Sequence, residues 1–130
     1  MIKIFHSQEG WESKVNFVDS NNILLGYDMA QQCCENADWF IADTANAPIP
    51  KNSDAPDEME GWNFDPSYFS EGFSDNEDSY HEDGSMAIFR IVNGDQEKFI
   101  HLYNCHNGYY SHGFDFKDQD KNETIQSGSL

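Results

Sequence analysis

A long acidic interval without basic residues most constrains how this chain can fold. Between Lys51 and Arg90 there is no lysine or arginine, although eleven aspartates and glutamates lie there. All four prolines fall in this interval or at its entrance. Proline removes a backbone N–H donor, and a run of like charges repels itself, so both disfavour regular structure. We therefore expect residues 43–85 to form a long acidic loop.

The same interval is rich in aromatic side chains, which a solvated tail does not usually carry. Large aromatic surfaces are stabilised by burial, so we expect them to pin the loop to the body of the protein. The aromatic residues in question are Trp62, Phe64, Tyr68, Phe69, Phe73 and Tyr80.

Length and charge exclude several classes of protein. The 130 residues suit one domain, and 24 acidic against 7 basic residues give a net charge of -17. Binding to nucleic acid or to an anionic membrane needs lysine and arginine, so we expect neither as a direct partner. No apolar stretch is long enough to span a bilayer, and residues 1–9 lack a signal-peptide core. We therefore expect a cytoplasmic protein.

The segment before the acidic interval predicts a hairpin followed by a helix. Residues 13–27 alternate polar and apolar residues around the turn-forming sequence Asp-Ser-Asn-Asn, which is typical of a β-hairpin. Asp28 and Gln31 have the spacing of a capping box. Apolar residues then recur at helical spacing, so we expect a short helix over residues 29–41.

The segment after the acidic interval predicts a β-meander. Residues 86–92 and 98–105 read as strands that flank the turn Asn93-Gly94-Asp95, and residues 109–116 read as a third strand. The polar residues 118–130 are expected to fray. Together these patterns predict an α+β fold in a single domain, residues 1–130, with antiparallel hairpins, one short helix and a long acidic loop.

Two short motifs resemble those of a family of small uncharacterised domains in bacteria and their phages. Residues 31–35, Gln-Gln-Cys-Cys-Glu, are similar to its Gln-x-Cys-Cys-Glu motif, and residues 107–111 to its Asn-Gly-Tyr-Tyr-Ser motif. The resemblance covers residues 13–41 and 86–116. His106 replaces the serine that is usual in the family, and the acidic insert separates the motifs. The resemblance implies a small α+β domain and brings no settled activity.

Cysteine and histidine could in principle form a metal or thiol site. The candidates lack the close paired spacing of structural zinc sites, and the simpler interpretation is that they are core residues. A cysteine near a helix start would gain thiolate character, but the surrounding carboxylates would oppose it. Weak calcium binding at residues 75–78 is a further alternative. We expect no cofactor. The candidate residues are Cys33, Cys34, Cys105, His101, His106 and His112.

The acidic interval is the best candidate for a functional surface. Its simplest interpretation is a solubilising loop, or an acidic surface common to all proteins of a salt-tolerant host. The functional interpretation is a mimic of DNA phosphates that binds a basic protein, as inhibitors of nucleic-acid-binding enzymes do. There are two alternatives to this function. One is an immunity protein against a basic nuclease toxin, and the other is an enzyme built on the cysteine and histidine residues named above. The predicted partner-binding residues are Asp57, Glu58, Glu60, Trp62, Asp75, Glu77, Asp78, Glu82 and Asp83.

Overall fold

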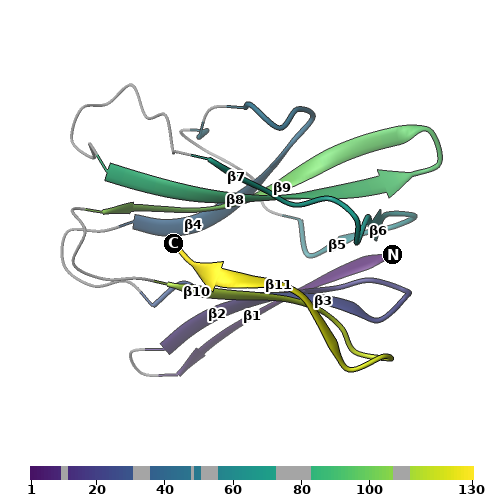
Figure 1. The fold of residues 1–130 in the computed structure, drawn as a ribbon, viewed down its shortest axis with the longest axis horizontal. Coiled ribbons are helices and arrows are strands. Elements are labelled where there is room, and N and C mark those ends of the chain that lie inside the picture. Colours follow the sequence, from purple (N-terminus) through teal and green to yellow (C-terminus); the bar gives the residue numbers. More distant parts are fainter. Residues whose placement is uncertain (10–11, 31–35, 48, 51–55, 73–82, 107–111) are drawn as a thin grey trace.

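The computed structural model is a sandwich of two antiparallel β-sheets, which form the upper and lower layers in Figure 1. It describes residues 1–9, 12–30, 36–47, 49–50, 56–72, 83–106 and 112–130, with the backbone only at residues 36, 72, 83–85, 105 and 106. These described residues contain no helix. The α+β prediction is therefore wrong, and the fold is all-β.

The lower, six-stranded sheet has the order β11-β10-β3-β2-β1-β5. A meander of three strands forms its centre, and strands from distant parts of the sequence extend it on both sides. The strands are β1 (Ile2–Glu9), β2 (Glu12–Val18), β3 (Ile23–Asp28), β5 (Glu58–Met59), β10 (Gly113–Asp118) and β11 (Glu123–Ser129).

The upper, five-stranded sheet has the order β4-β9-β8-β6, and β7 pairs with β8 beside β6. Its centre is one long hairpin, β8 and β9. The turn of this hairpin has Gly94 at φ 60° in its first central position, as a two-residue type II′ turn requires. The strands are β4 (Asn36–Ala42), β6 (Asn63–Phe64), β7 (Ser70–Gly72), β8 (Asp83–Asn93) and β9 (Gln96–His106).

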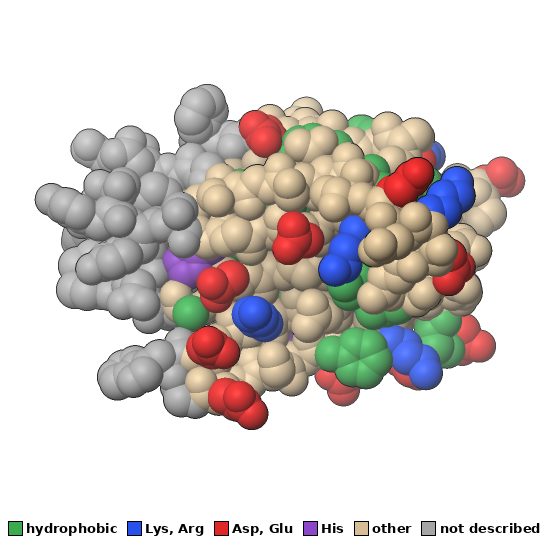
Figure 2. Space-filling view, turned by 60° about the horizontal axis from the view of Figure 1, so that its bottom comes forward, with side chains coloured by type: hydrophobic (Ala, Val, Ile, Leu, Met, Phe, Trp, Pro, Cys, Tyr) green, Lys and Arg blue, Asp and Glu red, His purple; other side chains and the backbone are tan. Residues whose placement is uncertain are grey.

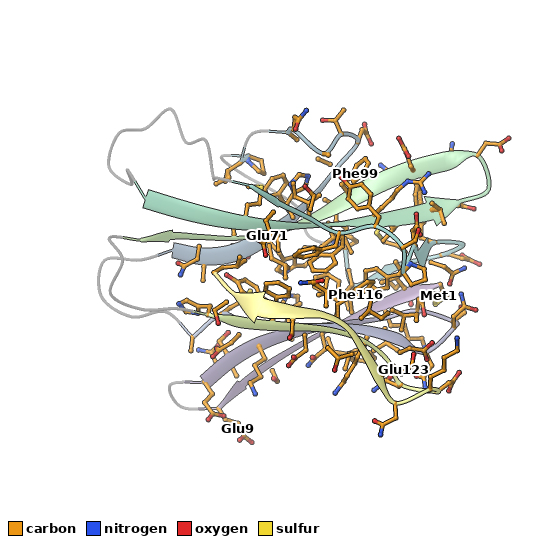
Figure 3. All side chains as sticks on the ribbon, in the orientation of Figure 1. Met1, Glu9, Glu71, Phe99, Phe116 and Glu123 are labelled. Atoms are coloured by element: carbon orange, nitrogen blue, oxygen red, sulfur yellow. The ribbon has the colours of Figure 1, made fainter. Side chains whose placement is uncertain are left out.

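The main core lies between the two sheets. Phe89 of β8 is fully buried, and its ring centroid lies 4.9 Å from that of Phe116 and 5.8 Å from that of Phe114, both on β10. Figure 3 shows Phe116 between the layers, whereas Phe99 stands on the outer side of the upper sheet. Alternate residues of each strand face inward, because successive side chains of a strand point to opposite faces.

A second, smaller apolar cluster covers the outer face of the upper sheet. Ala45, Ala47, Ile49 and Tyr68 pack against it. β8 and β9 are therefore buried on both faces, which explains their nearly continuous apolar sequences. The buried members of this outer cluster are Phe40, Met86, Ile88, Phe99 and Tyr103.

The predicted helix over residues 29–41 is wrong for a clear reason. Residues 31–35, including Gln31 of the expected capping box, lie outside the described residues. Asp28 accepts the N–H of Ala30 at 3.0 Å, which caps a turn rather than a helix. In β4, Ala37 and Trp39 face the main core, and Phe40 faces the outer cluster. Apolar residues on both faces of a buried strand can imitate helical spacing.

The structure also corrects the two ends of the predicted meander. The hairpins at residues 13–27 and 86–105 are confirmed as β2–β3 and β8–β9. The next strand, β10, instead pairs with β3 in the other sheet. The tail expected to fray forms β11, and Leu130 is buried and exchanges two 2.8 Å backbone hydrogen bonds with His112. The acidic interval contains β5, β6 and β7, so it is not one long loop.

Candidate acidic interaction surface

Within the acidic interval, residues 57–64 close one end of the sandwich. It begins in the lower sheet, where β5 pairs with Ile2 and Lys3 of β1, and it ends in the upper sheet, where β6 pairs with Val92 and Ile91 of β8. Figure 1 shows β5 and β6 together at the right end of the molecule. Since both strands belong to sheets, their positions are fixed by backbone hydrogen bonds.

Three predicted partner-binding carboxylates lie on this segment. Asp57, Glu58 and Glu60 are exposed, and none of them forms an ion pair with another described residue. Lys3 stands opposite Glu58 in the β1–β5 register, but no ion pair joins the two side chains. The three charges therefore face solvent on a backbone that the sheets hold in place. We call Asp57, Glu58 and Glu60 the β5 acidic group.

Asp19, which the sequence interpretation missed, anchors this segment. Its buried carboxylate accepts the N–H groups of Asn21 at 3.0 Å and Ile23 at 2.9 Å within the β2–β3 turn. Its second oxygen accepts the N–H of Phe64 in β6 at 2.9 Å. One side chain thus joins a turn of the lower sheet to the upper sheet. The sequence signal was an aspartate at the start of a turn-forming run, which identifies a local turn and not the distant partner.

The carboxylate of Asp65, just after residues 57–64, is neutralised by an ion pair. Arg90 of β8 lies 2.7 Å from both Asp65 and Glu97. The hydrogen bond from Ser67 lowers the pKa of Asp65, and Arg90 lowers it further, against the opposing effect of burial. The same two acids raise the pKa of Arg90. These charges fix the loop after β6 to the β8–β9 hairpin, so they are less free to bind a partner than the β5 acidic group.

The side chain of Trp62 is buried, unlike that of a residue that contacts a partner. It is 8% exposed and belongs to the main core, between β5 and β6. The ammonium group of Lys98 lies 5.8 Å from its ring centroid and is paired with Asp43 at 3.1 Å. Phe64 is also buried, and Phe69 and Tyr68 pack on the two apolar clusters. These four aromatic side chains pin the interval to the body, as the sequence predicted, while Phe73 and Tyr80 lie outside the described residues.

The structure does not bring the whole predicted set together on one face. Asp83 begins β8, whereas β6 pairs with the last residues of that strand. A strand of this length spans about 33 Å, so the backbone of Asp83 and the β5 acidic group lie near opposite ends of the sandwich. Asp75, Glu77, Asp78 and Glu82, and with them the calcium alternative, fall outside the described residues.

The outer face of the lower sheet carries charges of both signs. Figure 2 shows acidic and basic side chains interspersed on this side of the molecule. Lys3, Lys14 and Lys117 lie on β1, β2 and β10, and Asp115 lies two residues from Lys117. Figure 3 places Glu9 and Glu123 near opposite ends of the same sheet. This face is therefore a poor mimic of a phosphate ladder, which needs one sign of charge.

The proposed metal and thiol residues do not converge within the described part of the chain. No group of three or more histidine, cysteine, aspartate or glutamate side chains there could hold a metal ion. Cys33 and Cys34 lie outside the described residues, as do the side chains of Cys105 and His106. His101 is buried in the outer face of the upper sheet, and His112 is buried with its Nδ1 2.8 Å from the carbonyl oxygen of Asp28.

His101 is buried in an apolar site. It is fully buried, and its ring stacks on that of Phe40 with centroids 4.3 Å apart. Its Nε2 lies 3.1 Å from the carbonyl oxygen of Thr44, and its Nδ1 lies 3.3 Å from the sulfur of Met86. A carbonyl oxygen can only accept a hydrogen bond, so Nε2 is the donor and carries the proton of the neutral ring. Burial lowers the pKa of His101, and the Thr44 hydrogen bond only partly offsets this effect.

We expect His101 to make the fold less stable under mildly acidic conditions. Below the ordinary histidine pKa of about 6.5, the unfolded chain binds a proton that the folded chain does not bind. The free energy of unfolding therefore decreases as the pH is lowered. One such group contributes a slope of at most about 1.4 kcal/mol per pH unit. Urea unfolding of the wild type and of His101→Phe between about pH 7.5 and 5.5 should show a shallower slope for the variant. Parallel slopes would contradict this assignment.

Comparisons with known proteins give no match from which a function could be inferred. No protein-family model matches the chain, and no curated protein or solved structure matches it. The resemblance of residues 31–35 and 107–111 to a domain family stays a prediction. Within the described residues, no helix is long and apolar enough to cross a membrane.

Proposed function

We propose that the protein is an acidic binding protein that occupies the basic, nucleic-acid-binding surface of another protein. One observation supports this function most: Asp57, Glu58 and Glu60 are exposed and form no ion pair with the described residues, on a backbone held by both sheets. Charges on a backbone held in this way are attracted to a basic surface without a large loss of loop freedom on binding. The net charge of -17 adds long-range attraction, which speeds the encounter at low salt.

Charge reversal of the β5 acidic group tests this proposal. The variant Asp57→Lys, Glu58→Lys, Glu60→Lys should lose about 100-fold in affinity for the basic partner at low ionic strength, because repulsion replaces attraction at three positions. Candidate partners are first captured from a lysate of the source organism at low salt. A captured protein is accepted as the partner only if duplex DNA competes with the acidic protein for binding to it. Affinity is then measured by calorimetry at low and high salt.

The matched control reverses three exposed acids elsewhere. Glu9→Lys, Glu12→Lys, Glu71→Lys changes the net charge by the same amount, but Glu9 and Glu12 face each other at the turn end of the β1–β2 hairpin and Glu71 lies on β7 of the upper sheet. This control should keep most of the affinity. If the two variants weaken binding equally, overall charge and not the β5 acidic group determines recognition. If neither weakens it, the proposed function is wrong.

A further inference from the structure

The outer edge of β11 is not paired with any described strand. β11 ends the six-stranded sheet, and no described strand lies beyond it. His112 and Leu130 exchange two backbone hydrogen bonds of 2.8 Å, so they form a hydrogen-bonded pair of the antiparallel ladder. Such pairs recur at every second residue, which makes Phe114–Gly128 and Phe116–Gln126 the next two. The N–H and C=O groups of Ser127 and Ser129 therefore point away from the sheet, and both residues are exposed.

The other edge strands of the described sandwich are shorter or partly covered. β5 and β6 have two residues each and β7 has three, so they offer little backbone for pairing. At the edge strand β4, the carboxylate of Asp38 accepts the N–H of Trp39 at 2.8 Å. β11 has a register shift opposite Phe116 and Lys117, but residues 126–129 continue as regular strand without proline, lysine or any charged residue. These residues form an open edge of the described sandwich without a charged side chain, whereas the part of β1 that extends beyond β5, residues 5–9, is open but ends in Glu9.

The charge of the chain indicates what can occupy this edge. An open edge recruits any strand that can approach it, including a second copy of the same chain. Two copies would each bring a net charge of -17, and this repulsion opposes self-pairing at low salt. A basic strand is attracted instead, and it would meet Asp115 on the neighbouring strand and Glu123 at the start of β11. The acidity thus selects between two occupants that the backbone alone would accept.

We propose that the outer edge of β11 binds an extended, basic segment of the partner as an additional strand of the six-stranded sheet. The backbone hydrogen bonds of Ser127 and Ser129 set the register of this strand, and the net charge of -17 favours lysine- and arginine-rich sequences. This inference rests on the proposed function in one respect, because it assumes that the partner is basic.

Proline substitution at an outward-facing residue tests the proposal with a close control. Ser127→Pro removes an N–H that no described strand uses, whereas Ser127→Ala keeps it. The probe is a fluorescent peptide that alternates lysine and threonine, and binding is measured by anisotropy at low salt. We expect the proline variant to bind the peptide about tenfold more weakly and the alanine variant to bind it like the wild type. A peptide that alternates lysine and proline has the same charge but fewer N–H groups, so it should bind weakly to all three proteins.

Thermal unfolding of each variant establishes that it is folded, and Ser129→Pro replaces Ser127→Pro if the latter is not. Equal affinities of the proline and alanine variants for the lysine–threonine peptide would overturn the proposal. Dimerisation of the wild type at low salt that the proline variant abolishes would assign the edge to a second copy and would also overturn it. The proposed function fails separately: if reversal of the β5 acidic group abolishes partner binding and Ser127→Pro does not, the function stands and only the β11 inference is lost.

Discussion

Replacement of Asp19 by alanine is expected to lower the free energy of unfolding by about 3 kcal/mol or more. The substitution leaves three backbone N–H groups, those of Asn21, Ile23 and Phe64, without their acceptor. An unsatisfied buried donor costs about 1–3 kcal/mol, and the Asp19 site is itself buried. The loss should be large because the same carboxylate joins the β2–β3 turn to β6 in the other sheet.

Two comparisons make this prediction specific, with urea denaturation as the measurement. Asp19→Asn keeps one oxygen but turns an N–H donor toward one of the three N–H groups, so it should cost less than Asp19→Ala but more than about 1 kcal/mol. Asp95→Ala removes an exposed carboxylate from the β8–β9 turn, and it should change stability by less than about 0.5 kcal/mol. If Asp19→Ala is no more destabilising than Asp95→Ala, the role of Asp19 as a bridge between the sheets is wrong.

The sequence predicts local hairpins well and long-range pairing poorly. The turns at residues 19–22 and 93–95 contain the residues that such turns require, so both hairpins could be placed before the structure was known. The pairing of β10 with β3 joins residues about ninety positions apart, and neither turn chemistry nor periodicity specifies such a partner. For the same reason the sequence did not reveal β1, β11 or the two-layer arrangement.

The helix prediction shows how burial on two faces misleads a periodicity argument. β4 places Trp39 in the main core and Phe40 in the outer cluster, so adjacent residues are both apolar. A half-buried strand would have alternated clearly, but a strand covered on both faces does not. The covering residues Ala45, Ala47 and Ile49 belong to the acidic interval, which was expected to pack on the body only through its aromatic side chains.

The candidate site was predicted in part. The exposure of Asp57, Glu58 and Glu60 follows from their charge, because unpaired carboxylates are rarely buried. The sequence could not show that β8 separates these residues from Asp83 by most of the length of the sandwich. Aromatic residues between acids suit an interface and a core equally well, so Trp62 was assigned to the partner surface although its side chain is buried.

Truncation of Trp62 distinguishes between a role in the core and a role in an interface, because only a core residue strongly affects the stability of the free protein. Trp62→Ala should lower the free energy of unfolding by about 3 kcal/mol, because it removes a large side chain from the end of the main core between β5 and β6. Trp62→Phe keeps an aromatic ring at that position and should cost about 1 kcal/mol. Both values are measured by urea denaturation, in the absence of any partner.

An exposed interface anchor would behave in the opposite way, since its truncation weakens binding and leaves the free protein nearly unchanged. A loss of stability below about 0.5 kcal/mol in Trp62→Ala would therefore contradict the core assignment. Trp62 also lies between Glu60 and Asn63, on the segment that carries the β5 acidic group. Trp62→Phe should consequently keep both the fold and the affinity for a basic partner, because the backbone that holds Asp57, Glu58 and Glu60 stays paired with both sheets.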